Sequence, residues 1–250
     1  MPAKGPGRNF ETYLQKFPDI AGRIRLCDDG ETMNLQAVMS LGVTLLYLLL
    51  ALWGWGGLQG FFSSPARTGV VIVTIALAVA SCFSKSSGFG SGRREMTSNR
   101  WVVYALIILG LAIGWLAPHS DRHNWWIVDG NIARYVGLAM YLVGGIVRLI
   151  PVFELKNRFS ALIAVQEGHQ LKTDGMYRLV RHPSYAGLIV STAGWCLVFR
   201  SGIGLLLTLA ILISIIARIR AEERFLREEF GEEHAAYCRQ TPWRLLPFVY

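Results

Sequence analysis

A polar run in the second half of the chain has the composition of a binding site and stands at the start of an apolar stretch. It reads Arg181-His182-Pro183-Ser184-Tyr185. Pro183 lacks an amide hydrogen and fixes φ, so it suits the first turn of a helix, where free backbone N–H groups attract anions. Beside that turn, imidazole and phenol groups can hold a charged ligand or move a proton. The run is consistent either with such a site at a membrane boundary or with an ordinary helix start.

A second polar set follows about forty residues later and is expected to meet the first. Arg218 and Glu222 stand at i and i+4, with Glu223 next to them, so Arg218 and Glu222 share one helix face. Two apolar stretches separate the sets and are joined by a short turn at 200–202. A tight helical hairpin returns Arg218 to the side of His182. We therefore expect one common pocket, although a surface ion pair is the alternative for Arg218 and Glu222.

The composition places these sets in a membrane protein. Apolar residues make up 52% of the chain, charged residues 17%, and the mean hydropathy is +0.37. The net charge of +8 does not indicate nucleic-acid binding, because the charges lie between apolar runs rather than on one soluble face. We predict an all-α, polytopic integral membrane bundle of about six transmembrane helices. The expected spans are 35–57, 69–83, 101–118, 132–153, 185–199 and 202–217.

The distribution of positive charge supports six spans and sets their orientation. The segments before the first span, after the second and fourth, and after the sixth hold twenty Lys and Arg residues. The other three connections hold Arg67, Arg122 and Arg200. Positive residues are retained on the cytoplasmic side, so both termini and the polar pocket are predicted to be cytoplasmic.

The expected spans divide the chain into three parts. Residues 1–34 form a cytoplasmic segment, whose apolar spacing over 9–24 suits an interfacial helix or an ordinary surface helix. Residues 35–153 form a four-helix transmembrane region. Residues 154–250 carry both polar sets and are the candidate catalytic region, in which we expect a polar loop able to hold a cofactor, a two-helix hairpin and a cytoplasmic C-terminal helix.

Charged and metal-binding residue types elsewhere in the chain have simpler interpretations. Arg134 and Arg148 lie in the fourth span, so each must snorkel or face a polar partner, and the polar pocket is a candidate partner for Arg148. His119 and His123 are spaced i and i+4 but have no third ligand nearby. The four cysteines show no C-x-x-C spacing. We predict neither a metal site nor a disulfide.

Further polar positions extend the two sets into one long spaced pattern. The pattern runs through Gln166, His169-x-Leu171, Gly175-x-Tyr177, Arg181-His182-Pro183-Ser184-Tyr185-x-Gly187, Arg218-x-x-x-Glu222-Glu223, and Phe230-Gly231-Glu232-Glu233 followed by Tyr237. In this pattern the chain resembles the isoprenylcysteine carboxyl methyltransferases and the related phospholipid methyltransferases of membranes. The resemblance covers roughly residues 166–250, and the first 150 residues carry no such signature.

The resemblance implies S-adenosylmethionine as methyl donor and S-adenosylhomocysteine as product, bound without a Rossmann domain. It implies that Arg218 is catalytic and orients the acceptor, and that Arg181 and Glu223 also bind substrate. The cofactor residues that it implies are Gln166, His169, Gln170, Leu171, Lys172, Tyr177, His182, Pro183, Ser184, Tyr185 and Glu222. The stretch from Gln166 to His169 is shorter than in the family, and Gln170 and Lys172 depart from its pattern.

Simple chemistry indicates which functional group of the acceptor receives the methyl group. A carboxylate has a pKa near ~4 and is ionised at neutral pH, so an Arg that grips one oxygen leaves the other free to attack. An ammonium acceptor, as in phosphatidylethanolamine, must first lose a proton to a base such as Glu222. Arg218 therefore favours carboxyl O-methylation of a lipid-like, isoprenylcysteine-type acceptor over phospholipid N-methylation. A lipid-binding membrane scaffold is the non-enzyme alternative, and the sequence assigns no oligomeric state.

Overall fold

The molecule is built from helices, as the hydropathy pattern predicts. The computed structural model describes residues 18–83, 94–95, 100–155, 164–165 and 171–250. Its long helices are α2 (Pro18–Trp55), α3 (Pro65–Cys82), α4 (Arg100–Arg122), α5 (Asn131–Leu155), α6 (Pro183–Val198) and α7 (Gly202–Gln240). Two short 3-10 helices, η1 (Phe61–Ser63) and η4 (Gly175–Arg178), lie in connections. The strands β1 (Arg94–Glu95) and β2 (Ala164–Val165) form one two-residue antiparallel pair, so the all-α prediction is confirmed.

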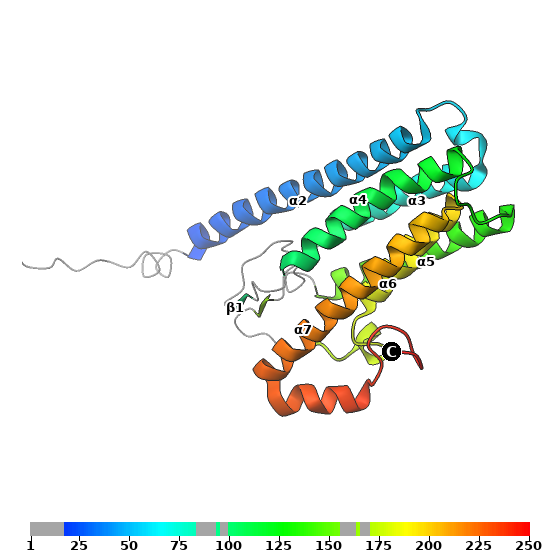
Figure 1. Cartoon of the computed structure of the whole chain (residues 1–250). Helices are drawn as coiled ribbons and strands as arrows, with labels where there is room; N and C mark the ends of the chain where they lie inside the picture. Colours follow the sequence, from blue (N-terminus) through cyan, green and yellow to red (C-terminus); the bar gives the residue numbers. More distant parts are fainter. Residues whose placement is uncertain (1–17, 84–93, 96–99, 156–163, 166–170) are drawn as a thin grey trace, which may run out of the picture.

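Each predicted apolar stretch coincides with one of the six long helices, and three of the stretches extend one or two residues past the helix end (Figure 1). Among the described residues, α2, α3, α4, α5 and α7 are long and apolar enough to cross a membrane. Helix α6 has 16 residues and spans about 24 Å, less than the roughly 30 Å of a hydrocarbon core. It packs against both α5 and α7, and its first turn meets protein rather than lipid, which explains how a short helix is tolerated.

The six helices pack in a closed order around a shared centre. Helix α2 contacts α4, α4 contacts α7, and α7 contacts α6. Helix α6 then contacts α5, α5 contacts α3, and α3 returns to α2. Residues far apart in the sequence therefore face one interior space.

The closest of these contacts joins α5 to α6 through glycines. A Cβ on Gly144 would lie 2.4 Å from the backbone nitrogen of Ser191, and a Cβ on Gly187 would lie 2.5 Å from that of Arg148. Real Cβ atoms do not approach other atoms so closely, so these positions require glycine. As in membrane proteins generally, small residues here allow two helix backbones to pack directly.

One buried carboxylate, Asp121, joins the ends of several helices on one side of the bundle. Its Oδ2 atom lies 2.8 Å from Nη1 of Arg134 and 3.2 Å from Nη1 of Arg67, and its Oδ1 lies 3.0 Å from Nε of Arg200. We call these four residues the Asp121 cluster. Arg67 lies in the first turn of α3 and Arg200 in the turn between α6 and α7, so the alternation of the helices brings them to the same end. Asp121 is also the polar partner that Arg134 requires.

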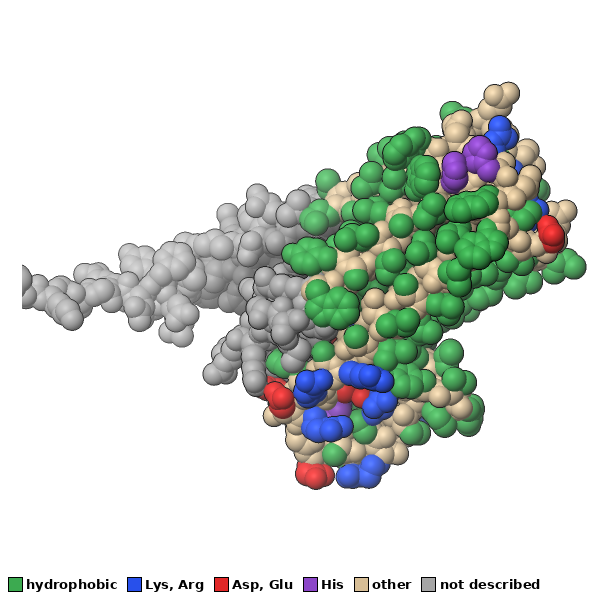
Figure 2. Space-filling model, in the orientation of Figure 1, with side chains coloured by type: hydrophobic (Ala, Val, Ile, Leu, Met, Phe, Trp, Pro, Cys, Tyr) green, Lys and Arg blue, Asp and Glu red, His purple; other side chains and the backbone are tan. Residues whose placement is uncertain are grey.

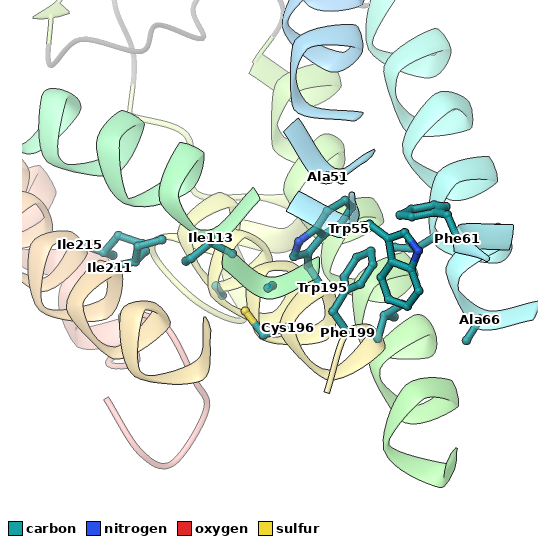
Figure 3. Close-up of a cluster of buried hydrophobic side chains, with 14 of the residues drawn as sticks. Ala51, Trp55, Phe61, Ala66, Ile113, Trp195, Cys196, Phe199, Ile211 and Ile215 are labelled. Carbon is teal, nitrogen blue, oxygen red and sulfur yellow. The ribbon is translucent and has the colours of Figure 1, made fainter. Parts of the chain in front are cut away.

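Apolar side chains form both the interior and the flanks of the bundle. Ala51, Trp55, Phe61, Trp195 and Phe199 are buried together in the core (Figure 3). On the outside, hydrophobic side chains cover the flank, whereas charged side chains gather towards the two ends (Figure 2). This distribution is that of a protein surrounded by lipid at mid-height.

Helix α7 continues well beyond the membrane-spanning length and then turns back. Its 39 residues correspond to about 58 Å, and its charged residues begin at Arg218, so we take 202–217 as the spanning part. Gly231 has φ 49° and ψ −118°, which breaks the helical path. The residues after Gly231 cross beneath the bundle (Figure 1).

We expect Gly144→Ala to destabilise the protein by about 1–3 kcal/mol, because the new methyl group forces the α5 and α6 backbones apart. Gly42→Ala is the matched control, since a Cβ on Gly42 meets nothing within 4 Å. Thermal unfolding of the purified proteins in detergent measures both changes. Equal melting temperatures for the two variants would contradict a tight α5–α6 contact.

Candidate active site

A cavity of about 920 Å³ occupies the centre of the bundle and receives side chains from all six long helices. Its polar end is lined by residues 181–185, Arg218 and Glu222. Its other end is lined largely by apolar residues of α2, α4 and α7, such as Val43 and Ile211. The cavity therefore joins a charged mouth to a lipid-like interior.

Tyr185 connects the two polar sets at the mouth. Its hydroxyl accepts a hydrogen bond from Nε of Arg218 at 2.6 Å and donates one to Oε2 of Glu222 at 3.0 Å. The rings of His182 and Tyr185 stack with centroids 5.8 Å apart. The hairpin of α6 and α7 thus brings both sets together, as the sequence predicts.

Glu223 lies behind this mouth and is held by three positive or hydrogen-bonding side chains. Its Oε1 is 3.2 Å from Nη2 of Arg181 and 3.4 Å from Nε2 of His182, and its Oε2 accepts a hydrogen bond from Nε of Arg244 at 2.8 Å. Burial alone would raise the pKa of Glu223, but His182, Arg181 and Arg244 lower it to about 2. The carboxylate stays ionised and fixes the position of His182.

Tyr177, at the other side of the mouth, is anchored through its backbone to the end of α7. The Tyr237 hydroxyl donates a hydrogen bond to the carbonyl oxygen of Tyr177 at 2.8 Å. Burial raises the pKa of the Tyr177 phenol above its usual range, and the nearby Glu222 charge raises it further. Tyr177 therefore remains protonated and presents a hydrogen-bond donor to the cavity that it lines.

The last ten residues of the chain hold the loop that carries His182. The backbone N–H of Arg181 donates to the carbonyl of Trp243, and that of His182 donates to the carbonyl of Arg244, both at 2.9 Å. Leu245 is buried in the hydrophobic core. The segment therefore works as a strap across the polar end of the bundle.

Most of the residues singled out from the sequence lie around the cavity. The described lining residues among them are Leu171, Lys172, Tyr177, Arg181, His182, Pro183, Ser184, Tyr185, Arg218 and Glu222. Glu223 does not line the cavity and makes the ion pairs described above. Gln166, His169 and Gln170 lie outside the described residues.

The sequence reasoning missed several residues of the cavity and of the ion pairs behind it. Arg244 carries no distinctive spacing, and its partner Glu223 is 21 residues away. Tyr47, Thr74 and Tyr141 line the cavity from the half of the chain in which no motif was found. The only sequence feature that could have indicated them is a hydroxyl group within an otherwise apolar span.

The two histidines with metal-like spacing have other neighbours. His119 stacks on Trp115 with ring centroids 4.7 Å apart, and its centroid lies 4.5 Å from that of His123. Within the described part of the chain, no group of three or more His, Cys, Asp or Glu residues is arranged to hold a metal ion.

Three comparisons show which known proteins this chain is similar to. Residues 137–228 match the isoprenylcysteine carboxyl methyltransferase (ICMT) family. A probable protein-S-isoprenylcysteine O-methyltransferase from Oryza sativa subsp. indica is 28% identical over 167 residues, which cover 63% of this chain and 84% of the relative. Protein-S-isoprenylcysteine O-methyltransferase B from Arabidopsis thaliana is 30% identical, with 58% and 74% covered. A solved structure of the eukaryotic intramembrane Ras methyltransferase ICMT is 18% identical, with a TM-score of 0.44 over 92% of this chain and 98% of that chain.

The helical bundle and its cavity define a multi-pass integral membrane protein with a polar site at one end of its spans. Family membership supplies the class of chemistry, which is methyl transfer. The chain belongs to the isoprenylcysteine carboxyl methyltransferase family.

We expect Glu223→Gln to lower the free energy of unfolding by about 3 kcal/mol, because it leaves Arg181 and Arg244 without their buried counter-charge. The matched control is Glu232→Gln, whose carboxylate is exposed and lies 3.7 Å from Arg239. Chemical or thermal unfolding in detergent compares the two variants. A Glu223→Gln protein as stable as the control would show that the ion pairs do not hold the site together.

Proposed function

We propose that the protein is an S-adenosylmethionine-dependent carboxyl O-methyltransferase, and that its acceptor is a carboxylate on a lipid-like, isoprenylcysteine-type tail. The observation that carries this proposal is a cavity with a cationic mouth and an apolar interior. An acceptor with an anionic head and a greasy tail complements both ends. Family membership supports the same reaction.

The charges around the cavity favour an anionic acceptor over a cationic one. Among the described lining residues, Arg148, Lys172, Arg181 and Arg218 are cations and Glu222 is a carboxylate. An ammonium head group would be repelled by this wall, whereas a carboxylate would be attracted.

The position of Arg148 within the membrane span strengthens the preference for an anionic acceptor. It is on α5, within the span, and lines the cavity. No ion pair joins it to a carboxylate among the described residues, although a cation at membrane depth is costly without a partner. A substrate carboxylate held between Arg148 and Arg218 would supply that partner.

The mouth also has the groups that the methyl donor needs. S-adenosylmethionine supplies, when bound, a methyl group already activated on a sulfonium. Glu222 can bind its ammonium group, and Tyr177 can donate a hydrogen bond. No side-chain hydrogen bond caps the first turn of α6, so backbone N–H groups there can receive the carboxylate of the donor.

The protein residues then contribute positioning rather than proton transfer. Arg218 would grip one oxygen of the acceptor carboxylate and leave the other facing the methyl group of the donor, which would transfer as its bond to sulfur breaks and S-adenosylhomocysteine is released. Tyr185 holds the Arg218 guanidinium through its hydroxyl. Apolar walls exclude water, which strengthens these interactions and prevents competing hydrolysis. Glu223 acts as a positioning residue through His182.

The orientation in the membrane follows from the charge distribution. Among the described residues, more Lys and Arg lie at the end of the bundle that holds the polar mouth than at the other end, which supports a cytoplasmic site and cytoplasmic termini. In the three-part division of the chain, residues 154–250 would supply most of the polar machinery. Residues 35–153 would supply most of the acceptor channel, together with Arg148.

The decisive experiment identifies the labelled product. The purified protein in lipid vesicles is incubated with methyl-labelled S-adenosylmethionine, and either N-acetyl-S-farnesylcysteine or phosphatidylethanolamine is the acceptor. We expect base-labile methyl ester label in the first and none in the second. Label in phosphatidylethanolamine alone would replace carboxyl transfer with N-methylation, and label in neither would favour a non-enzymatic lipid-binding protein.

We expect Arg218→Ala to reduce methyl transfer by at least about a hundredfold while it leaves S-adenosylhomocysteine affinity nearly unchanged, because it removes the acceptor contact. Glu222→Ala should instead weaken S-adenosylhomocysteine binding. Arg220→Ala, an exposed neighbour on the same helix, is the matched control. Titration calorimetry gives the affinity, and label transfer gives the rate. Equal loss of S-adenosylhomocysteine binding in both site variants would refute this division of roles.

A further inference from the structure

The strap at 241–250 closes on itself through its backbone. The N–H group of Leu245 donates to the carbonyl oxygen of Tyr250 at 2.8 Å, and that of Val249 donates to the carbonyl oxygen of Leu246 at 3.2 Å. The side chain of Leu245 is buried in the hydrophobic core. Main-chain hydrogen bonds and this buried side chain therefore give the strap a defined shape at the polar end of the bundle.

Three other apolar side chains of the strap are on its surface. Leu246, Phe248 and Val249 expose 49%, 85% and 75% of their area. Phe248 has φ 66°, a left-handed backbone conformation that costs energy for a bulky residue. Exposed apolar side chains that lie together mark a contact with an apolar surface. We call Leu246, Phe248 and Val249 the strap tip.

The strap is attached at the level where the membrane span of α5 ends. The N–H group of His182 donates to the carbonyl oxygen of Arg244, so the strap lies beside the residue before α6. Gly187 of α6 packs against Arg148 of α5, and the two helices run in opposite directions. Phe153 lies about 7.5 Å from Arg148 along α5 and is therefore close to the level of His182. Phe153 belongs to the apolar span of α5 and is partly exposed.

Apolar surface is needed at this level because α6 is short. Its 16 residues span about 24 Å, which leaves roughly 6 Å of the hydrocarbon thickness uncovered. Leu179, in the loop before α6, is exposed like the strap tip. Hydrophobic side chains cover the surface where the strap lies and adjoin the apolar flank of the bundle (Figures 1 and 2). The strap tip thus continues the surface that faces lipid.

Positive side chains accompany the strap tip. Arg239 and Arg178 are exposed, and the hydroxyl of Thr241 donates to the backbone carbonyl of Arg178 at 3.4 Å. The guanidinium of Arg244 lies 5.0 Å from the centre of the Tyr250 ring. Apolar side chains flanked by arginines suit the boundary of a bilayer, where acyl chains meet anionic head groups.

We propose that the strap tip inserts into the bilayer at the boundary between acyl chains and head groups, and that it thereby anchors the loop that carries His182. The partner is the lipid leaflet on the side of the mouth, because the tip adjoins the lipid-facing flank and carries the positive charges that anionic head groups attract. The strap transmits the anchor through its backbone hydrogen bonds to Arg181 and His182. The inference does not depend on the reaction that the mouth performs.

Photochemical labelling in vesicles tests the membrane contact. Phe248 is replaced by p-benzoylphenylalanine, and the full chain is placed in vesicles of phosphatidylcholine and phosphatidylglycerol and irradiated. Val143, an exposed residue in the middle of α5, is the lipid-facing reference, and Glu232, whose side chain is 92% exposed, is the water-facing reference. We expect lipid adducts at position 248 at about the yield of position 143, and at least about tenfold above that of position 232.

Mass spectrometry of the photoproducts distinguishes the possible partners. A yield of lipid adducts at position 248 as low as at position 232 would overturn the proposal. Adducts between two copies of the chain, in place of lipid adducts, would overturn it in favour of a protein contact. Because Val249 is also exposed, the same replacement at Val249 repeats the test if the Phe248 variant does not fold.

Hydrogen exchange in the same vesicles tests whether the anchor steadies the loop. Phe248→Asp places a charge in the apolar boundary and is expected to speed exchange of the Arg181 and His182 amides by about threefold or more. Phe248→Leu keeps an apolar side chain and should retain the wild-type rates. Lipid adducts at position 248 together with unchanged exchange in Phe248→Asp would leave the membrane contact and overturn its effect on the loop.

Discussion

The site depends on one buried charge, the carboxylate of Glu223. It joins the loop before α6 through Arg181 and His182, and the strap at 241–250 through Arg244. A buried carboxylate is stable only while its partners surround it, so the three segments hold one another in place. Without this contact the loop would keep only its backbone hydrogen bonds to residues 243 and 244 and the hydrogen bonds that Tyr177 and Tyr185 make with α7. The geometry of the mouth, and with it the approach of Tyr185 to Arg218, follows from this pairing.

A steric constraint complements the electrostatic one. Gly187 of α6 lies directly against the backbone of Arg148 on α5. About one helical turn away, Gly144 of α5 lies against the backbone of Ser191 on α6. Because no side chain separates the helices here, the cation at membrane depth sits beside the helix that carries Tyr185. The polar site is thus fixed by an ion-pair network at its outer side and by backbone contact at its inner side.

The sequence predicts those parts of the molecule that depend on local pattern. Apolar stretches locate all six helices, and the short turn at 200–202 places Arg218 on the side of His182. Contacts between distant segments could not be predicted from the sequence, because they depend on how the helices pack. Asp121 lies 54 residues from Arg67 and binds three guanidinium groups, of which hydropathy places Arg67 and Arg200 in loops and Arg134 in a span. The reversal at Gly231 likewise requires a backbone angle that the motif around it does not specify.

The arrangement of polar and apolar surface explains why such a site lies at the end of a membrane bundle. A carboxylate is stable in water, whereas the long apolar tail attached to it is stable in hydrocarbon. The molecule therefore lies at the boundary between the two. A site there needs a charged wall for the head, and a channel that continues among the spans for the tail. The closed order of six helices provides both, since α7 and the loop before α6 bring most of the charges and α2 to α5 bring most of the channel. Tyr185 stands where the two surfaces meet, bonded to Arg218 on one side and to Glu222 on the other. Its hydroxyl therefore couples the group proposed to hold the acceptor to the group proposed to hold the methyl donor.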